Sequence, residues 1–229
     1  MADYYKDEAK HYVAVDCIIF GFDGNRLKLL LIKRNFEPGK GQWSLMGGFL
    51  KENEGLDNAA QRILEQLTGL QDIFLEQLLT YGEVDRDPAA RVLSVAYYAL
   101  INTSNFDEFK AKNYKGSWFE LTEMPELIFD HAEMVDKARK RLRRKAKNQP
   151  IGFELLPQKF TLPQLMKLYE AIYDQKFDKR NFRKKLLSYN ILKMLDEKDK
   201  KGSRKGAFLY QFDADKYEKM ILNGFSFEL

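Results

Sequence analysis

A short basic segment, residues 179–188, combines cations, an amide and apolar side chains at helical spacing. Phe182, Leu186 and Leu187 would dock one side of a helix and leave the polar residues facing outward. Arginine and asparagine can make paired hydrogen bonds to guanine and adenine edges, and lysine suits phosphates. The outward residues that we expect to contact nucleic acid are Lys179, Arg180, Asn181, Arg183 and Lys184.

A second basic cluster surrounds Gly202, and the elements around both clusters follow one order. Thr161 with Gln164 predicts the start of a helix that runs to residue 173, and Asp178 predicts the start of the next helix. Strands are expected at 191–195 and 207–212, with a charged turn at 196–206. This order is typical of a winged helix-turn-helix, whose second helix enters the major groove. The wing cations are Lys198, Lys200, Lys201, Arg204 and Lys205.

Each cluster alone could be a solvated basic surface. Because the two clusters occupy the two positions that one DNA-binding fold uses, we favour duplex DNA, with RNA as an alternative. A third run, residues 137–147, holds eight basic and no acidic residues. It could contact phosphates or form the solvated face of a connecting helix, and the sequence leaves both open.

The first part of the chain alternates strands and helices. Hydrophobic periodicity predicts strands at 12–20, 27–32, 73–84, 91–101 and 117–121, and helices at 56–67 and 130–147. Gly69 stands where a helix C-cap belongs. The pattern indicates an α+β or α/β arrangement.

The segment from Trp43 to Leu70 resembles the Nudix hydrolase signature. Gly48, Glu54, Arg62 and Gly69 keep its spacing. The metal-binding glutamates of that signature are replaced, and the residues in their places are Ile63, Gln66 and Leu67. Isoleucine and leucine cannot ligate a metal, so we expect no hydrolysis, no metal and no cofactor. Glu54 and Arg62 are expected to survive as a structural pair.

Segments in both halves resemble Nudix-related transcriptional regulators. These segments are 83–100, 160–165, 169–171 and 178–186. The resemblance, strongest to arabinose-responsive regulators of Bacteroides-type bacteria, implies a homodimeric repressor of an α+β fold class. A Nudix-like α/β/α sandwich with a mixed sheet, residues 1–149, would bind the effector and dimerise. A winged helix-turn-helix, residues 150–229, would bind a palindromic DNA operator.

The sequence constrains the identity of the effector less than it constrains the fold. ADP-ribose carries a diphosphate that this fold normally meets with metal and arginine, whereas a neutral sugar needs polar acceptors and an aromatic face. We therefore favour a sugar, L-arabinose by resemblance. The expected effector residues are Trp43, Phe49, Glu83, Arg86, Asp87 and Tyr97. Core packing of the aromatics and a loop-fixing Arg86–Asp87 ion pair are the alternatives.

The expected function is thus a ligand-responsive repressor of sugar catabolism. The alternatives are an ADP-ribose-sensing regulator of NAD metabolism and a residual Nudix hydrolase.

Composition agrees with a DNA-bound protein of the cytoplasm. One cysteine, Cys17, excludes an intrachain disulfide, and the chain opens with a polar segment instead of a signal peptide or membrane anchor. The chain has two histidines, His11 and His131, so we do not expect a zinc site or a histidine-based catalytic triad. Residues 1–136 carry a net charge of −9, residues 137–147 of +8 and residues 148–229 of +5. This polarity would turn the basic end toward DNA.

Overall fold

The long strand β1 (Tyr12–Phe22) lies at the centre of the larger sheet. Successive side chains of a strand point to opposite faces, so Val15, Cys17 and Ile19 enter one core and Ile18, Phe20 and Phe22 the other. Burial on both faces explains the nearly unbroken apolar run in the sequence. The computed structural model describes residues 4, 6–71, 73–103, 116–200, 205–225 and 227–228.

The larger sheet is mixed. β1 pairs in parallel with β6 (Val92–Asn102), with Tyr12 opposite Val92, and its other partners are antiparallel. The strand order is β3 (Trp43–Ser44), β2 (Leu27–Lys33), β1, β6 and β5 (Glu76–Tyr81). Two further strands join it, β4 (Met46–Phe49) on β1 and β7 (Gly116–Glu120) on β2.

One helix covers each face of this sheet. α1 (Leu56–Thr68) buries Ala59, Ile63 and Leu64 against one face, and it ends at Gly69, whose φ of 72° fits a glycine C-cap. α3 (His131–Asn148) buries Met134, Val135, Ala138 and Leu142 against the other face. The predicted α/β/α sandwich with a mixed sheet is confirmed.

The winged helix-turn-helix is also confirmed. A short turn, η2 (Phe153–Leu155), leads into β8 (Phe160–Thr161), α4 (Leu162–Tyr173) and α5 (Lys179–Ser188). Thr161 and Gln164 form the predicted capping box at the start of α4. The wing consists of β9 (Leu192–Asp199) and β10 (Ala207–Phe212), and β8 pairs with β10 to complete a three-stranded sheet.

Several elements differ from the predictions. The strand expected at 73–84 is confined to Glu76–Tyr81. β9 continues to Asp199 through residues expected to form a turn, because an exposed two-stranded ribbon accepts polar residues as long as its backbone pairs. An unpredicted helix, α6 (Ala214–Leu222), begins where Asp213 accepts a hydrogen bond from the Lys216 N–H.

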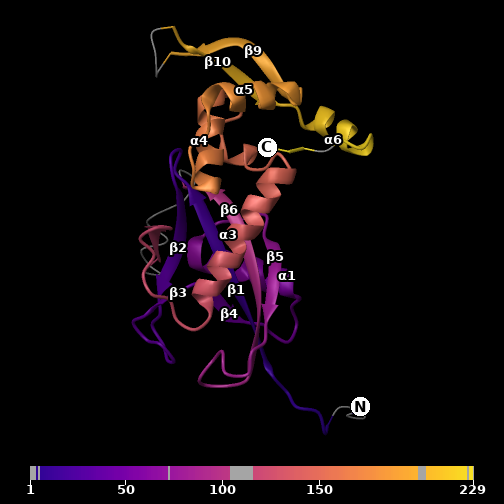
Figure 1. Cartoon of the computed structure of the whole chain (residues 1–229). Coiled ribbons are helices and arrows are strands. Elements are labelled where there is room, and N and C mark those ends of the chain that lie inside the picture. The colour runs from indigo at the N-terminus through magenta and orange to yellow at the C-terminus, as the bar shows by residue number, and fades with distance from the viewer. Residues whose placement is uncertain are drawn as a thin grey trace.

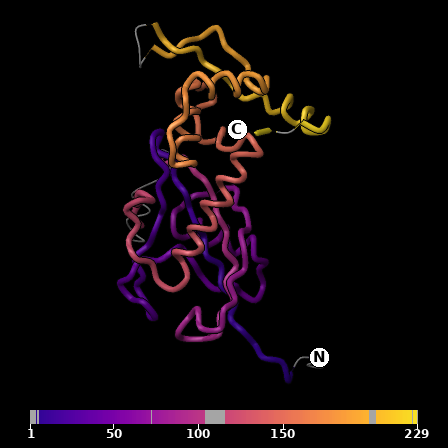
Figure 2. The backbone as a smooth tube through the Cα atoms, in the orientation of Figure 1, coloured from indigo at the N-terminus to yellow at the C-terminus, as the bar shows by residue number. Residues whose placement is uncertain are grey.

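α3 joins the two parts of the molecule. It runs along the sheet and packs against α4, so that the winged helix caps the end of the molecule away from the N-terminus (Figure 1). The backbone tube shows the same route through α3 into α4 (Figure 2). The division predicted between residues 149 and 150 falls just after α3, and the independence of the two domains stays a prediction. Within the described residues, no helix combines the length and apolarity needed to cross a bilayer.

Candidate functional site

The predicted recognition helix α5 presents its polar residues to solvent. Phe182 and Leu186 are buried, and Asp178 fixes the first turn by accepting a hydrogen bond of 2.8 Å from the Asn181 N–H. Leu187 was expected to dock but is 36% exposed, because it lies on the outer side of the helix. All five predicted contact residues are exposed: Lys179, Arg180, Asn181, Arg183 and Lys184.

The wing adds cations beside this helix. Lys198, Lys200 and Lys205 are exposed, and the Lys198 ammonium lies 4.4 Å from the centre of the Phe208 ring. Lys201 and Arg204 lie outside the described residues. A cavity of ≈ 580 Å³ lies between α5 and the wing and is lined by Lys179, Arg183 and Phe208 among others.

The basic run on α3 is largely engaged within the protein. Arg139 and Arg143 approach Asp174 at 3.7 and 4.0 Å, and Lys145 and Arg141 both pair with Glu76. Two further lysines form pairs along the helix, Lys137 with Glu133 and Lys140 with Asp136. These contacts favour the connecting-helix interpretation over direct phosphate contact.

On the Nudix-like helix α1, one of the three positions that the signature gives to glutamate is buried in the core. Ile63 is 2% exposed, and its side chain lies 3.3 Å from where a Cβ on Gly48 would stand. Gln66 is exposed and Leu67 half-buried. The described residues contain no group of three or more His, Cys, Asp or Glu arranged to hold a metal.

Glu54 and Arg62 form the predicted structural pair. The guanidinium donates from Nε to Oε2 at 2.8 Å and from Nη2 to Oε1 at 2.5 Å. Arg62 Nη2 also donates to the Phe49 carbonyl at 3.1 Å, which ties α1 to the end of β4. The hydrogen bonds from Arg62 lower the pKa of Glu54 to about 2.

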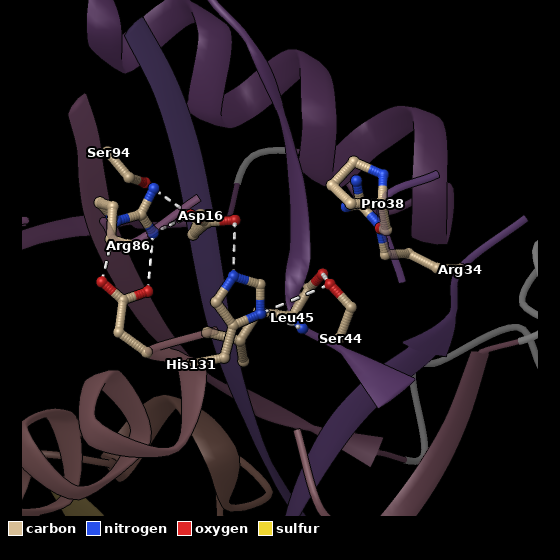
Figure 3. Close-up of polar contacts among 9 residues, drawn as sticks. Asp16, Arg34, Pro38, Ser44, Leu45, Arg86, Ser94 and His131 are labelled. Carbon is tan, nitrogen blue, oxygen red and sulfur yellow. Dashed lines mark hydrogen bonds and ion pairs between the residues drawn. The ribbon is translucent and has the colours of Figure 1, made fainter. Parts of the chain in front are cut away.

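A buried polar cluster lies between β1 and the start of α3 (Figure 3). We call Asp16, Arg86, Ser94, Asp130 and His131 the Asp16 cluster. Arg86 donates to both carboxylate oxygens of Asp130, at 2.8 and 2.7 Å, and its Nη2 lies 3.8 Å from Asp16 Oδ2. Ser94 donates to Asp16 Oδ2 at 2.5 Å. These residues belong to β1, β6, the β5–β6 loop and the start of α3.

The imidazole of His131 completes the cluster in its neutral form. Burial lowers the pKa of His131, while the carboxylate of Asp16 works in the opposite direction. The Leu45 N–H donates to Nδ1 at 3.1 Å, so the imidazole proton is assigned to Nε2, which faces Asp16 Oδ1 at 3.8 Å.

Arg34 stands at the edge of the cluster and was overlooked in the sequence. Its Nε donates to the Pro38 carbonyl at 2.7 Å, and its guanidinium lies 4.0 Å from the Phe36 ring centre. Burial lowers the pKa of Arg34, whereas the carboxylates of Asp87 and Asp16 act in the opposite direction. Neither spacing nor periodicity marked Arg34, because it follows a strand in a loop.

The structure separates the six predicted effector residues. Arg86 belongs to the Asp16 cluster and pairs with Asp130, so the alternative of a loop-fixing Arg86–Asp87 ion pair is not the pair that forms. Asp87 instead accepts a hydrogen bond from the Ala89 N–H at 2.9 Å, and Glu83 is exposed.

Two of the three predicted aromatic effector residues, Tyr97 and Trp43, pack inside the protein. Tyr97 is buried beneath α1 and donates to Asp57 at 2.6 Å, on the face of the sheet opposite the cluster. Trp43 packs edge-on against Phe119 at 4.8 Å, as the core alternative predicted. Phe49 is exposed and lies 5.6 Å from the Tyr12 ring.

Comparison with known proteins identifies both parts of the chain. Residues 10–139 match the NUDIX domain family, and residues 152–212 match the NrtR DNA-binding winged helix domain. The chain is 32% identical over 223 residues to the ADPR responsive transcriptional repressor NtrR of Acinetobacter baylyi, across 95% of this chain and 89% of that protein. The chain belongs to the NrtR family.

NrtR structures have the same architecture. Shewanella oneidensis NrtR complexed with a 27mer DNA is 28% identical, with a TM-score of 0.77 over 94% of this chain and 97% of that one. Its NUDIX domain complexed with ADP ribose is 28% identical, with a TM-score of 0.50 over 62% of this chain and 99% of that one.

A Methanocaldococcus jannaschii ADP-ribose pyrophosphatase is 34% identical over 125 residues, which cover 54% of this chain and 70% of that protein. The expected similarity to arabinose-responsive regulators receives no support from these relatives. The Acinetobacter baylyi repressor is named as ADPR responsive, and the Shewanella oneidensis NUDIX domain is complexed with ADP ribose.

Proposed function

We propose that this NrtR-family protein is a DNA-binding repressor whose NUDIX domain binds ADP-ribose without hydrolysing it. The observation that carries the DNA-binding half is the exposure of Arg180, Arg183 and Lys184 on a helix anchored by buried Phe182 and Leu186. An anchored helix with free cations and an amide has the groups that read base edges and hold phosphates.

A second copy of the chain would supply the second recognition helix. Closed two-fold symmetry is the commonest assembly of identical chains, and it matches a palindromic operator. Each recognition helix would then meet one half-site, and half-sites about one DNA turn or a multiple apart would fix the distance between the helices.

The Asp16 cluster and Arg34 are the proposed effector site. In the NrtR relatives the effector is ADP-ribose, whose diphosphate needs compensating positive charge. With Ile63, Gln66 and Leu67 in place of metal-binding glutamates, the guanidinium of Arg34 is the group at hand for that charge, since that of Arg86 is already paired with Asp130.

The same substitutions favour binding without turnover. Phosphoanhydride hydrolysis in this fold relies on metal ions that neutralise the diphosphate and activate water. Ile63 and Leu67 cannot ligate a metal, and the amide of Gln66 is a weak substitute for a carboxylate.

A neutral sugar is a second candidate, favoured by the charge of the site itself. The carboxylates of Asp16, Asp87 and Asp130 outnumber the two guanidiniums, and His131 is neutral. Carboxylates and a neutral imidazole suit the hydroxyl groups of a polyol better than a diphosphate. The relatives support ADP-ribose, so the sugar is kept as a rival outcome of the test.

Fluorescence anisotropy with duplex DNA from upstream of the protein's own gene tests the DNA-binding half. We expect affinity to fall steeply as salt rises and to drop about 5- to 150-fold in Arg183→Ala. Lys40→Ala, an exposed cation on the NUDIX domain, is the matched control and should bind like the wild type. Equal affinity for a random duplex would contradict operator recognition.

Calorimetry with ADP-ribose and with L-arabinose tests the effector half. We expect ADP-ribose to bind, Arg34→Met to weaken it, and incubation with Mg²⁺ to yield no AMP. Binding of the sugar alone would support the second candidate. Turnover that disappears in Glu54→Gln would instead show a hydrolase.

A further inference from the structure

We infer that Arg143 and Asp174 are positioning residues that couple the NUDIX domain to the recognition helix through α3. The inference rests on the proposed function, because it describes how occupancy of the Asp16 cluster would change DNA binding. It gives the α3 cations that face Asp174 a role other than phosphate contact or exposure to solvent.

The first turn of α3 is built into the Asp16 cluster. Asp130, the residue before the helix, is held by both hydrogen bonds of Arg86, and His131, the first helical residue, faces Asp16 and Leu45. Phe129 precedes them with a φ of 53°, a left-handed conformation unusual for a bulky side chain. The surrounding contacts must therefore hold this entry to the helix.

The second half of α3 contacts the end of α4 through hydrogen bonds and ion pairs. Arg143 Nε donates to the Ile172 carbonyl at 3.0 Å, and the Tyr173 hydroxyl donates back to the Arg143 carbonyl at 3.3 Å. Arg139 and Arg143 also approach the Asp174 carboxylate. These contacts satisfy the last turn of α4 immediately before the chain turns into α5.

Asp174 lies in the turn between the two helices of the helix-turn-helix. It is the C-cap of α4, with φ 56° and ψ 42°, and four residues later Asp178 begins the recognition helix. Because α3 is a continuous helix of 18 residues, about 27 Å long, a rotation or shift of its first turn moves the guanidiniums that hold Asp174. An effector that draws Arg86 or His131 toward itself would therefore change the orientation of α5.

Reciprocal linkage measures this coupling. In the wild type we expect ADP-ribose to weaken operator binding about tenfold or more, and the operator to weaken ADP-ribose binding by the same factor. Asp174→Asn keeps a residue that tolerates the left-handed backbone but removes the charge facing Arg139 and Arg143. Arg143→Met removes the donor to Ile172 and keeps the aliphatic stem.

Both variants should bind ADP-ribose like the wild type in the absence of DNA, while both linkage factors fall below about threefold. Asp136→Asn is the matched control, since Asp136 pairs locally with Lys140 on the same helix, and its factors should stay unchanged. Because the Asp174 side chain is 61% exposed, thermal unfolding should hardly change. Linkage within about twofold of wild type in both variants would overturn the inference.

A ligand-free experiment separates this inference from the proposed function. If neither ADP-ribose nor L-arabinose alters operator binding by the wild type, the proposed sensing fails. Operator affinities of Asp130→Asn, Asp174→Asn and the double variant then decide the coupling, after thermal unfolding has shown that each is folded. Distant independent sites give effects that multiply within about twofold. A deviation of about threefold or more supports coupling, and simple multiplication overturns it.

Discussion

Arg86 and Asp130 form a bidentate ion pair, in which Arg86 Nε lies 2.8 Å from Asp130 Oδ2 and Nη2 lies 2.7 Å from Oδ1. The pair joins the β5–β6 loop to the start of α3, across 44 positions of sequence. The Arg86 side chain is 3% exposed, so its charge is compensated almost wholly by Asp130 and nearby Asp16. The pair therefore fixes the position of the helix that reaches the winged domain.

Removal of Arg86 should destabilise the protein strongly. Arg86→Met leaves two carboxylates without their cation in a buried site, a change that costs about 3–5 kcal/mol. Arg26→Met is the matched control, because Arg26 forms an ion pair with Glu120 and its side chain is 59% exposed. The control should lose less than about 1 kcal/mol in urea unfolding. Similar losses in both variants would mean that burial of the Arg86 pair has no energetic consequence.

The Glu54–Arg62 pair should stabilise the fold in a pH-dependent manner. The pKa of Glu54 lies at about 2 in the folded protein, below its ordinary value of 4.5, so the folded state binds fewer protons between these values. Its contribution is therefore complete above pH 4.5 and is lost as the pH falls toward 2. The difference in melting temperature between wild type and Glu54→Gln should shrink over that interval. A difference that stays constant from pH 6 to 3 would contradict the lowered pKa.

Restoring a carboxylate at position 63 should damage the fold without creating a hydrolase. Ile63 is almost wholly buried against Gly48, so Ile63→Glu both removes apolar packing and buries a charge, at a cost of at least about 2 kcal/mol. Gln66→Glu, on the exposed side of α1, should change stability by less than about 0.5 kcal/mol. Urea unfolding of both variants, with assays for AMP release, checks this. A stable Ile63→Glu protein that cleaves ADP-ribose would show that the metal face persists.

Local signals predicted most of the architecture. The apolar arc from Leu56 to Leu67 and the Gly69 cap define α1 almost to the residue, and Thr161 with Gln164 marks the start of α4. These features depend on neighbours within one or two helical turns. The wing was predicted less accurately, because the polar residues from Asp196 to Asp199 resemble a turn in composition, whereas Lys198 and Asp199 pair with β10 and continue the strand.

The Asp16 cluster depends on contacts that no local pattern encodes. Asp16 sits in a strand that otherwise reads as apolar, Ser94 follows 78 positions later, and His131 belongs to a helix still further along. Arg86 was predicted as an effector residue, and the alternative gave it an ion-pair partner next to it in sequence, Asp87. Only the parallel pairing of β1 with β6 and the packing of α3 on that face bring these groups together.

The release of operator DNA by ADP-ribose tests the central claim most directly. Fluorescence anisotropy of a labelled operator bound to the wild-type protein should fall to the value of free DNA as ADP-ribose is added, while Arg34→Met should require more ligand. L-Arabinose added in parallel should leave the complex intact. Anisotropy that stays unchanged at ADP-ribose concentrations shown by calorimetry to saturate the protein would contradict the account.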